Sequence, residues 1–125
     1  MENLLNKAPV KRIRDYIKNF NSSLDILVLK KSAKTAKDAS VLLNCEIGAI
    51  VKSLLLKING NFLICLIAGD RKCSFVKLKE IFNKEDIHMA SPNEVKINTG
   101  FSIGGVAPFA HKKKLDVLID KSLKR

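Results

Sequence analysis

Apolar and polar positions alternate with helical spacing at the start of the chain. Over residues 9–21 apolar residues recur every three or four positions with charged residues between them, which predicts an amphipathic helix. The short apolar run 24–29 predicts a strand. Helical spacing returns over residues 35–43, and Thr35 is a suitable N-cap because its hydroxyl can accept a hydrogen bond from the first turn.

The middle of the chain has the pattern of a β-hairpin. Two β-rich runs, 46–58 and 61–68, are separated by Asn59-Gly60. Both turn residues tolerate the positive φ of a type I′ turn, so this pair between apolar runs is a strong hairpin signal. We therefore expect two adjacent antiparallel strands.

The second half predicts short elements in alternation. Helical spacing marks residues 75–82 and a short strand is expected over 87–89. Ser91-Pro92-Asn93-Glu94 has the pattern of a capping box with proline at the first helical position, and that helix should stop at Gly100. A last strand is expected over residues 115–119. The order predicts an α+β fold with a mixed sheet, and 125 residues suit one domain spanning 1–125.

A glycine-rich loop follows the last predicted helix. Residues 100–108 contain three of the six glycines and end in Pro108. Glycine lets a ligand approach the backbone closely and leaves N–H groups able to face a carbonyl or an anion. A tight connection between helix and strand explains the same composition. The loop matches neither of the usual phosphate-binding glycine patterns, so by itself it indicates a binding loop without naming the ligand.

Lys52 interrupts an otherwise apolar strand. Strand alternation places it on the same face as Leu54 and Leu56, and both faces of this strand look largely buried. A lysine in that position must reach solvent, a partner or a ligand anion. A lysine that extends to solvent along an edge strand is the alternative.

Other catalytic constellations have little support. Neither histidine lies beside a candidate serine, so a Ser-His-Asp triad is not indicated. His88 is interpreted as structural, whereas His111 follows the glycine loop and could face the same cleft. No His/Cys/Asp cluster has the spacing of a metal site. The odd cysteine count, with no CxxC pair, argues against a disulfide framework, and Cys65 is expected to be a small core residue.

The net charge is +11, mostly from lysine. Basic residues cluster at positions 30–37 and 112–114, which favours an RNA partner held by its phosphates, although a solvated basic surface is the alternative. Aromatic residues are few, so a base-stacking platform is not evident. No apolar stretch is long enough for a membrane helix or a signal region, which predicts a soluble cytoplasmic protein.

Taken together, these landmarks resemble the YbaK-like family, which is related to the editing domain inserted in bacterial prolyl-tRNA synthetase. The IVKSL run at 50–54 and TGFSIGGVAPF at 99–109 carry most of the resemblance. The other matching segments, in family order, are residues 35–39, 68–70, 77–78, His111 and 119–120.

The resemblance implies a mixed, partly barrel-like sheet flanked by helices and a deacylase that hydrolyses the ester of mischarged aminoacyl-tRNA. In such enzymes the lysine, here Lys52, contacts the terminal nucleotide. A water attacks, often assisted by the 2′-hydroxyl of the substrate, and no covalent nucleophile, metal or cofactor is needed. The partners implied are the 3′ end and acceptor stem of tRNA, and an aminoacyl-tRNA synthetase is a further candidate partner. The residues carried over are Lys52, Gly104 and Gly105 as catalytic, and Ser53, Val106, Ala107, Pro108 and His111 as substrate-binding.

Two departures from the family pattern qualify this interpretation. Family members usually continue well past the position of Asp120, so the resemblance implies a C-terminally shortened form. Ala110 also stands where glycine is common. A catalytically silent tRNA- or protein-binding module of the same fold is therefore the main alternative. A basic RNA-binding protein unrelated to editing would leave Lys52 and the glycine loop unexplained. The edited amino acid is not decided by the sequence.

Overall fold

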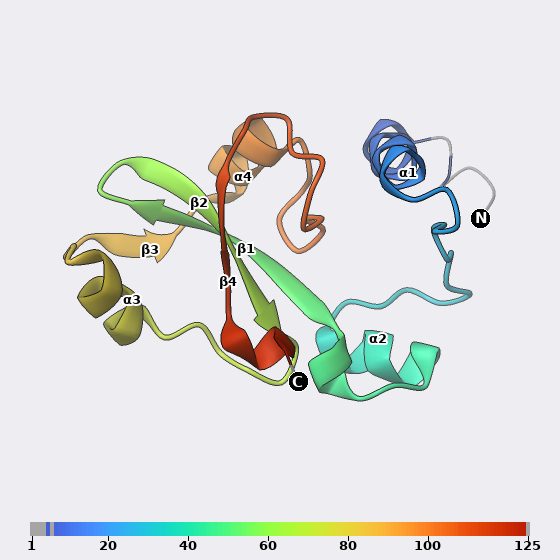
Figure 1. The fold of residues 1–125 in the computed structure, drawn as a ribbon, viewed down its shortest axis with the longest axis horizontal. Coiled ribbons are helices and arrows are strands. Elements are labelled where there is room, and N and C mark those ends of the chain that lie inside the picture. Colours follow the sequence, from blue (N-terminus) through green and yellow to red (C-terminus); the bar gives the residue numbers. More distant parts are fainter. Residues whose placement is uncertain (1–4, 6, 125) are drawn as a thin grey trace.

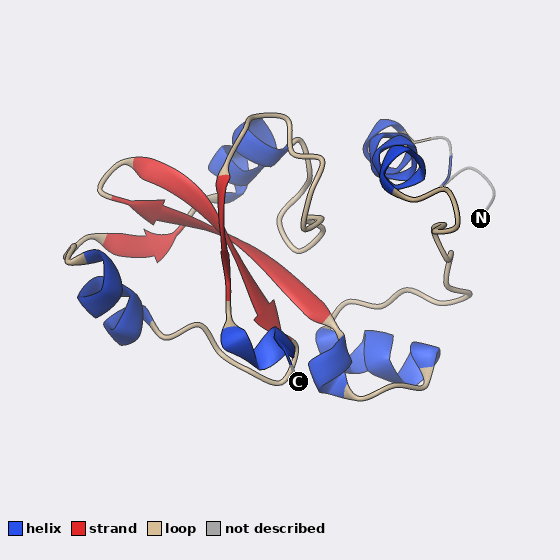
Figure 2. Ribbon diagram, viewed as in Figure 1, coloured by secondary structure: helices blue, strands red, loops and turns tan. Residues whose placement is uncertain are grey.

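The computed structural model describes residue 5 and residues 7–124, which form short helices around one sheet (Figures 1 and 2). The α-helices are α1 (Ala8–Phe20), α2 (Ala36–Leu43), α3 (Phe75–Phe82) and α4 (Pro92–Thr99). The strands are β1 (Val51–Ile58), β2 (Asn61–Ala68), β3 (Ile87–Met89) and β4 (Asp116–Ile119). The structure also describes two 3-10 turns, η2 (Ile47–Ala49) and η3 (Lys121–Lys124).

The sheet has the strand order β3-β1-β2-β4. β1 and β2 form the predicted antiparallel hairpin, in register from Val51 opposite Ala68 to Ile58 opposite Asn61. Asn59 (φ 46°) and Gly60 (φ 86°) form its turn with the positive φ angles expected of type I′. β3 is antiparallel to β1 and β4 is parallel to β2. The predicted α+β class with a mixed sheet is confirmed, and the sheet is open because β3 and β4 are its edges.

Both faces of the hairpin are buried. One face packs Leu56 and Cys65 against Leu78 of α3, and Cys65 is thus the core residue that was expected. The other face packs Leu55 and Ile64 against Val95 of α4 and Ala90, which lies just before that helix. α3 and α4 therefore cover opposite faces of the hairpin (Figure 1). This explains why β2 is almost continuously apolar and why β1 has three consecutive leucines, Leu54–Leu56, rather than a strict alternation.

Local capping signals fix the starts of two helices as predicted. The Thr35 hydroxyl accepts from the Asp38 N–H at 3.1 Å at the start of α2. In α4 the Ser91 hydroxyl accepts from the Glu94 N–H and the Glu94 carboxylate accepts from the Ser91 N–H, which completes the capping box. Gly100 ends α4 with a φ of 79°.

The strand predicted for residues 24–29 is wrong. This segment is an extended connection between α1 and α2 that pairs with none of the four strands. Leu24 is 46% exposed and Leu27 is 72% exposed. A strand requires a hydrogen-bonded neighbour, and this connection lies apart from the strands on its way from α1 to α2 (Figure 1). Apolar composition alone therefore does not make this segment a strand.

The first predicted hairpin strand begins later than expected. The η2 turn and its two flanking residues occupy positions 46–50: the Ala49 N–H donates to the Glu46 carbonyl and the Ile50 N–H donates to the Ile47 carbonyl, each at 3.0 Å. These local bonds occupy groups that a strand would use for its ladder.

Among the described residues, no helix is both long and apolar enough to cross a membrane.

Candidate functional site

Lys52 lies at the N-terminal end of β1, beside the C-terminal end of the neighbouring strand β2. It pairs with Ile67, and its ammonium donates a hydrogen bond to the carbonyl oxygen of Arg71, just beyond β2. The side chain is half-buried. An ammonium carries three donor hydrogens, so one bond to a carbonyl leaves capacity for a ligand anion. Its charge is therefore held at the mouth of the fold and not within the apolar core.

Gly69 brings α2 against this end of the hairpin. Its N–H donates to the Ile50 carbonyl at 2.7 Å. A Cβ at this position would lie 2.5 Å from the Ile47 oxygen and 2.9 Å from the Cβ of Ala36. Any side chain would force these segments apart. Sequence reasoning missed this requirement, because the clash involves residues that are distant along the chain.

A cleft of about 880 Å³ opens beside Lys52. Residues from four parts of the chain line it: the start of α2, the beginning of β1, the turn after β2 and the glycine loop. Of the predicted site residues, Lys52, Ser53, Gly104 and Val106 line this cleft. Gly105, Ala107, Pro108 and His111 are not among its lining residues. The structure thus brings together half of the predicted site.

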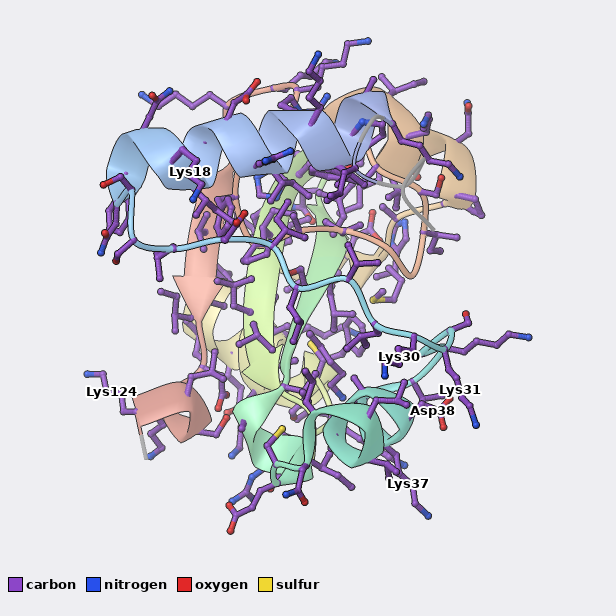
Figure 3. All side chains as sticks on the ribbon, turned by 90° about the vertical axis from the view of Figure 1, so that its right-hand side faces the viewer. Lys18, Lys30, Lys31, Lys37, Asp38 and Lys124 are labelled. Carbon is purple, nitrogen blue, oxygen red and sulfur yellow. The ribbon has the colours of Figure 1, made fainter. Side chains whose placement is uncertain are left out.

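The rim of the cleft is strongly basic. Besides Lys52, four lining residues carry positive charge: Lys34, Lys37, Arg71 and Lys72. Asp70 is the acidic residue on the lining. Lys30, Lys31 and Lys37 project outward around the N-terminal part of α2 (Figure 3), so the basic stretch predicted from sequence continues from the surface into the cleft.

The tip of the glycine loop is a tight turn. The Gly105 N–H donates to the Ser102 carbonyl at 2.9 Å, and Gly104 has a φ of 81°, as the third residue of a type II turn requires. A Cβ on Gly104 would meet no atom within 4 Å, so the space beside it is open. Because the Gly105 N–H is used inside the turn, it does not face a ligand in this conformation. Within the described part of the chain, the N–H groups of Gly104, Val106 and Ala107 have no protein acceptor.

The stem of the loop is buried on the side of α4 and is hydrogen-bonded across its base. Thr99 is 0% exposed, and its hydroxyl donates to the Val95 carbonyl at 2.7 Å while accepting from the Phe101 N–H at 3.0 Å. The Lys112 and Lys113 N–H groups donate to the carbonyls of residues 99 and 98, which joins the two ends of the loop. These bonds join the two ends of the loop at its base, and the tip beyond them is exposed.

His111 braces the loop from within. Its Nε2 lies 2.7 Å from the Ala107 carbonyl oxygen, and donation to this acceptor requires the hydrogen on Nε2. The ring packs edge-on against Phe101, with centroids 6.2 Å apart. The sequence placed His111 near the cleft, and the structure instead directs its Nε2 to the backbone of the loop.

Ser53 is a half-buried residue of the cleft wall. Its hydroxyl is shielded from solvent and has no hydrogen-bond partner among the described residues. It lies on the opposite strand face from Lys52, yet both line the cleft, because the cleft reaches around the end of β1. Buried hydroxyls are almost always hydrogen-bonded, so an unpaired one beside a cleft is a candidate ligand contact.

In the described ranges, no group of three or more His, Cys, Asp or Glu side chains could hold a metal ion.

Comparison with known proteins identifies the family. The profile of the aminoacyl-tRNA editing domain matches residues 30–125, which is most of the chain and includes every segment that lines the cleft. The chain belongs to the aminoacyl-tRNA editing domain family. Helix α1 lies outside the matched region.

Relatives of this family include free-standing proteins and parts of larger enzymes. The chain is 33% identical over 117 residues to the uncharacterized protein YwhH of Bacillus subtilis, covering 93% of the chain and 74% of that protein. It is also 33% identical over 89 residues to proline–tRNA ligase of Staphylococcus haemolyticus, covering 71% of the chain and 16% of the ligase.

A solved structure shares the whole fold. The crystal structure of a proposed trans-editing enzyme for prolyl tRNA synthetase superimposes with a TM-score of 0.85 at 29% identity, covering 94% of this chain and 74% of that one. The family and this neighbour support aminoacyl-tRNA editing as the broad function.

Proposed function

We propose that this chain is a hydrolase that cleaves the ester joining a wrong amino acid to the 3′-terminal adenosine of tRNA. The observation that carries the proposal is the shared cleft, in which Lys52, Ser53 and the tip of the glycine loop meet inside a basic rim. Its volume of about 880 Å³ falls within the range of small-molecule sites. An aminoacylated adenosine is a ligand of that class with an anionic backbone attached.

The basic residues supply the nucleic-acid end of the site. Lys52 is suited to a phosphate of the terminal nucleotide because two of its donor hydrogens are not directed at Arg71. Lys34, Lys37 and Lys72 surround the same opening and suit the phosphates that follow. Binding by these charges should weaken as salt rises, because displaced counterions drive it.

The loop and Ser53 supply the aminoacyl end. The N–H groups of Gly104 and Val106 are suited to stabilising the oxyanion that develops on the ester carbonyl. The Ser53 hydroxyl is suited to a polar group of the amino acid. Ala107 and Pro108 support the loop behind these groups, and His111 fixes the Ala107 carbonyl.

The reaction that this arrangement supports is attack by water. The described residues that line the cleft include no histidine, cysteine or glutamate, and their one carboxylate is that of Asp70, so the lining does not offer the usual pair of a nucleophile and a histidine base. The water oxygen bonds to the ester carbonyl carbon, the bond to the ribose oxygen breaks, and a proton passes to that oxygen. The free amino acid and the uncharged tRNA leave. The protein contributes positioning and electrostatic stabilisation.

A panel of tRNAs charged with non-cognate amino acids tests the proposal. The full chain should accelerate ester loss for at least one of them. Lys52→Ala should lower kcat/KM by roughly 10- to 100-fold, since a hydrogen bond to a charged group contributes about 1.5–3 kcal/mol. Lys79→Ala is the matched control, because Lys79 is exposed on α3 away from the cleft lining.

Two results would reject the proposal or its site. Ester loss at the spontaneous rate for every charged tRNA would reject the hydrolase. Equal activity of Lys52→Ala and wild type would reject the assigned role of Lys52.

A silent tRNA-binding module is the second candidate. The internal bond of the Gly105 N–H favours it, because that bond removes one of the donors expected to face the oxyanion. Salt-dependent tRNA binding without ester loss would support this candidate over the hydrolase.

A further inference from the structure

Helix α1 packs against the stem of the glycine loop with few contacts. None of its residues is buried. The guanidinium of Arg12 reaches across the stem: its Nε donates to the Ala110 carbonyl at 2.9 Å, and its Nη2 donates to the Thr99 carbonyl at 3.1 Å. These acceptors lie on the two sides of the loop, so one planar group links the place where the loop begins to the place where it ends.

The surroundings of Arg12 are shaped around its guanidinium. The group lies over the ring of Phe101, 4.7 Å from its centroid, which is the geometry of a cation–π contact. Gly100 lies directly beneath, and a Cβ there would come within 2.5 Å of Nη2. Nearby, Tyr16 stacks on Phe109 with ring centroids 4.9 Å apart. Gly100 therefore lets the arginine approach the backbone.

We propose that Arg12 is a positioning residue that holds the glycine loop in its working conformation. The proposal rests on the proposed function. Between the two carbonyls that Arg12 bonds lie Ile103, Gly104 and Val106, the loop residues on the cleft wall. The tip has one internal backbone bond of its own, from the Gly105 N–H to Ser102, so its place relative to Lys52 depends on the stem. A shift of about 1 Å in a catalytic group can reduce a rate by about 100-fold.

The chemistry of this contact is specific to arginine. A planar guanidinium presents several donors in a fixed fork and stacks on an aromatic face, whereas a lysine ammonium is a single point of charge. Arg12→Lys keeps the charge but removes the planar fork that donates to both carbonyls while it stacks on Phe101. Arg12 also lies outside residues 30–125, so the family profile does not cover this contact.

Variants at two arginines of the same helix separate positioning from charge. Arg12→Gln removes the fork, and Arg14→Gln is the control, because it makes the same charge change at an exposed position without a hydrogen bond to the loop. On the aminoacyl-tRNA that wild type cleaves fastest, Arg12→Gln should lower kcat by on the order of 10- to 100-fold with KM changed less than about threefold. Arg12→Lys should be intermediate, and Arg14→Gln should match wild type.

Amide hydrogen exchange gives a readout that does not depend on activity. In Arg12→Gln the amides of residues 102–107 should exchange faster, whereas those of the β1–β2 hairpin should keep their wild-type rates. Arg12→Lys provides the same comparison if Arg12→Gln does not fold. If wild type is inactive but the loop amides of Arg12→Gln exchange faster, the proposed function is rejected, whereas the role of Arg12 in holding the loop is supported.

Three outcomes would overturn the role of Arg12. Unchanged loop exchange with unchanged kcat would show that the contact does not position the loop. Faster exchange in the hairpin as well would show a contribution to global stability only. A loss confined to KM would place Arg12 in substrate binding.

Discussion

The β1–β2 hairpin and helix α1 are held in the fold by different means. In the hairpin Leu55, Leu56 and Ile64 are at most 1% exposed, and both faces are covered. Helix α1 has no buried residue and attaches through Arg12 and Tyr16. Complete apolar burial holds the first, whereas partly buried apolar residues and a few directional contacts hold the second.

The two walls of the cleft differ in the same way. Lys52 and Ser53 stand on the hairpin, so their wall is fixed by the core of the protein. Gly104 belongs to a loop whose stem is linked to a helix without buried side chains. Segments with few buried apolar contacts open at a lower free-energy cost than core strands. We therefore expect one wall of the site to be rigid and the other to respond to changes at α1.

Matched truncations of two isoleucines test the contrast most strongly. Ile64 is 0% exposed in the hairpin, whereas Ile17 is only partly buried on α1. Ile64→Ala should lower the free energy of unfolding by about 2–5 kcal/mol because it removes buried methyl groups and leaves a cavity. Ile17→Ala should lower the free energy of unfolding by less than about 1.5 kcal/mol. Urea unfolding measures both, and equal losses would break the comparison.

Local signals made the hairpin and the helix starts predictable from sequence. Asn59-Gly60 fixes the turn through its φ angles, and the Ser91 capping box fixes the start of α4 through bonds within four residues. Such features depend on neighbours along the chain. The apolar run around Lys52 also indicated that both faces of β1 are largely buried, and the structure covers both faces of the hairpin.

Features set by distant partners were not predictable in this way. The segment 24–29 has the composition of a strand but lacks a strand neighbour. The need for Gly69 arises from Ile47 and Ala36, and the role of Arg12 arises from carbonyls about 90 positions later.

The candidate site also has features that the sequence predicted and features that it did not. Family resemblance selected Lys52 and the glycine loop, and the structure places Lys52 and Gly104 on one cleft. The internal bonds of Gly105 and His111 depend on backbone angles within the loop, which neither composition nor motif reveals.

Acid titration tests whether a polar link also supports the hairpin. The Lys57 ammonium lies 2.7 Å from the Glu94 carboxylate and joins β1 to α4. The hydrogen bond from Lys57, followed by that from the Ser91 N–H, lowers the pKa of Glu94 from 4.5 to about 2. A carboxyl with a depressed pKa stabilises the fold above its unfolded pKa, and that stability is lost as pH falls toward the folded value.

Wild type should therefore lose stability more steeply than Glu94→Gln between about pH 4.5 and pH 2. Asp25 and Asp120 also have lowered pKa values, through hydrogen bonds from the Ile26 N–H and from Ser122, and they contribute equally in both proteins. Urea midpoints measured across this range give the difference. This difference in unfolding free energy should be smaller than the loss caused by Ile64→Ala. Parallel pH profiles of wild type and Glu94→Gln would show that the Lys57–Glu94 ion pair does not stabilise the fold.

The smallest expected effect lies where α1 meets the loop. Ala110 has a φ of 61°, a left-handed conformation that costs a non-glycine residue about 1–2 kcal/mol. Ala110→Gly relieves this strain but adds about 0.4–1 kcal/mol of unfolded-state entropy, so we expect a net gain of up to about 1 kcal/mol in urea unfolding.

The bond from Arg12 should survive this change, because its acceptor is the backbone carbonyl of residue 110. Ala49→Gly is the control: Ala49 does not have a positive φ, so glycine there should destabilise the protein by about 0.5–1 kcal/mol. Opposite signs for the two substitutions would show that strain stored beside the Arg12 contact, and not the general cost of glycine, sets the stability of this junction. A loss of stability in Ala110→Gly would mean that the methyl group contributes packing that outweighs the strain.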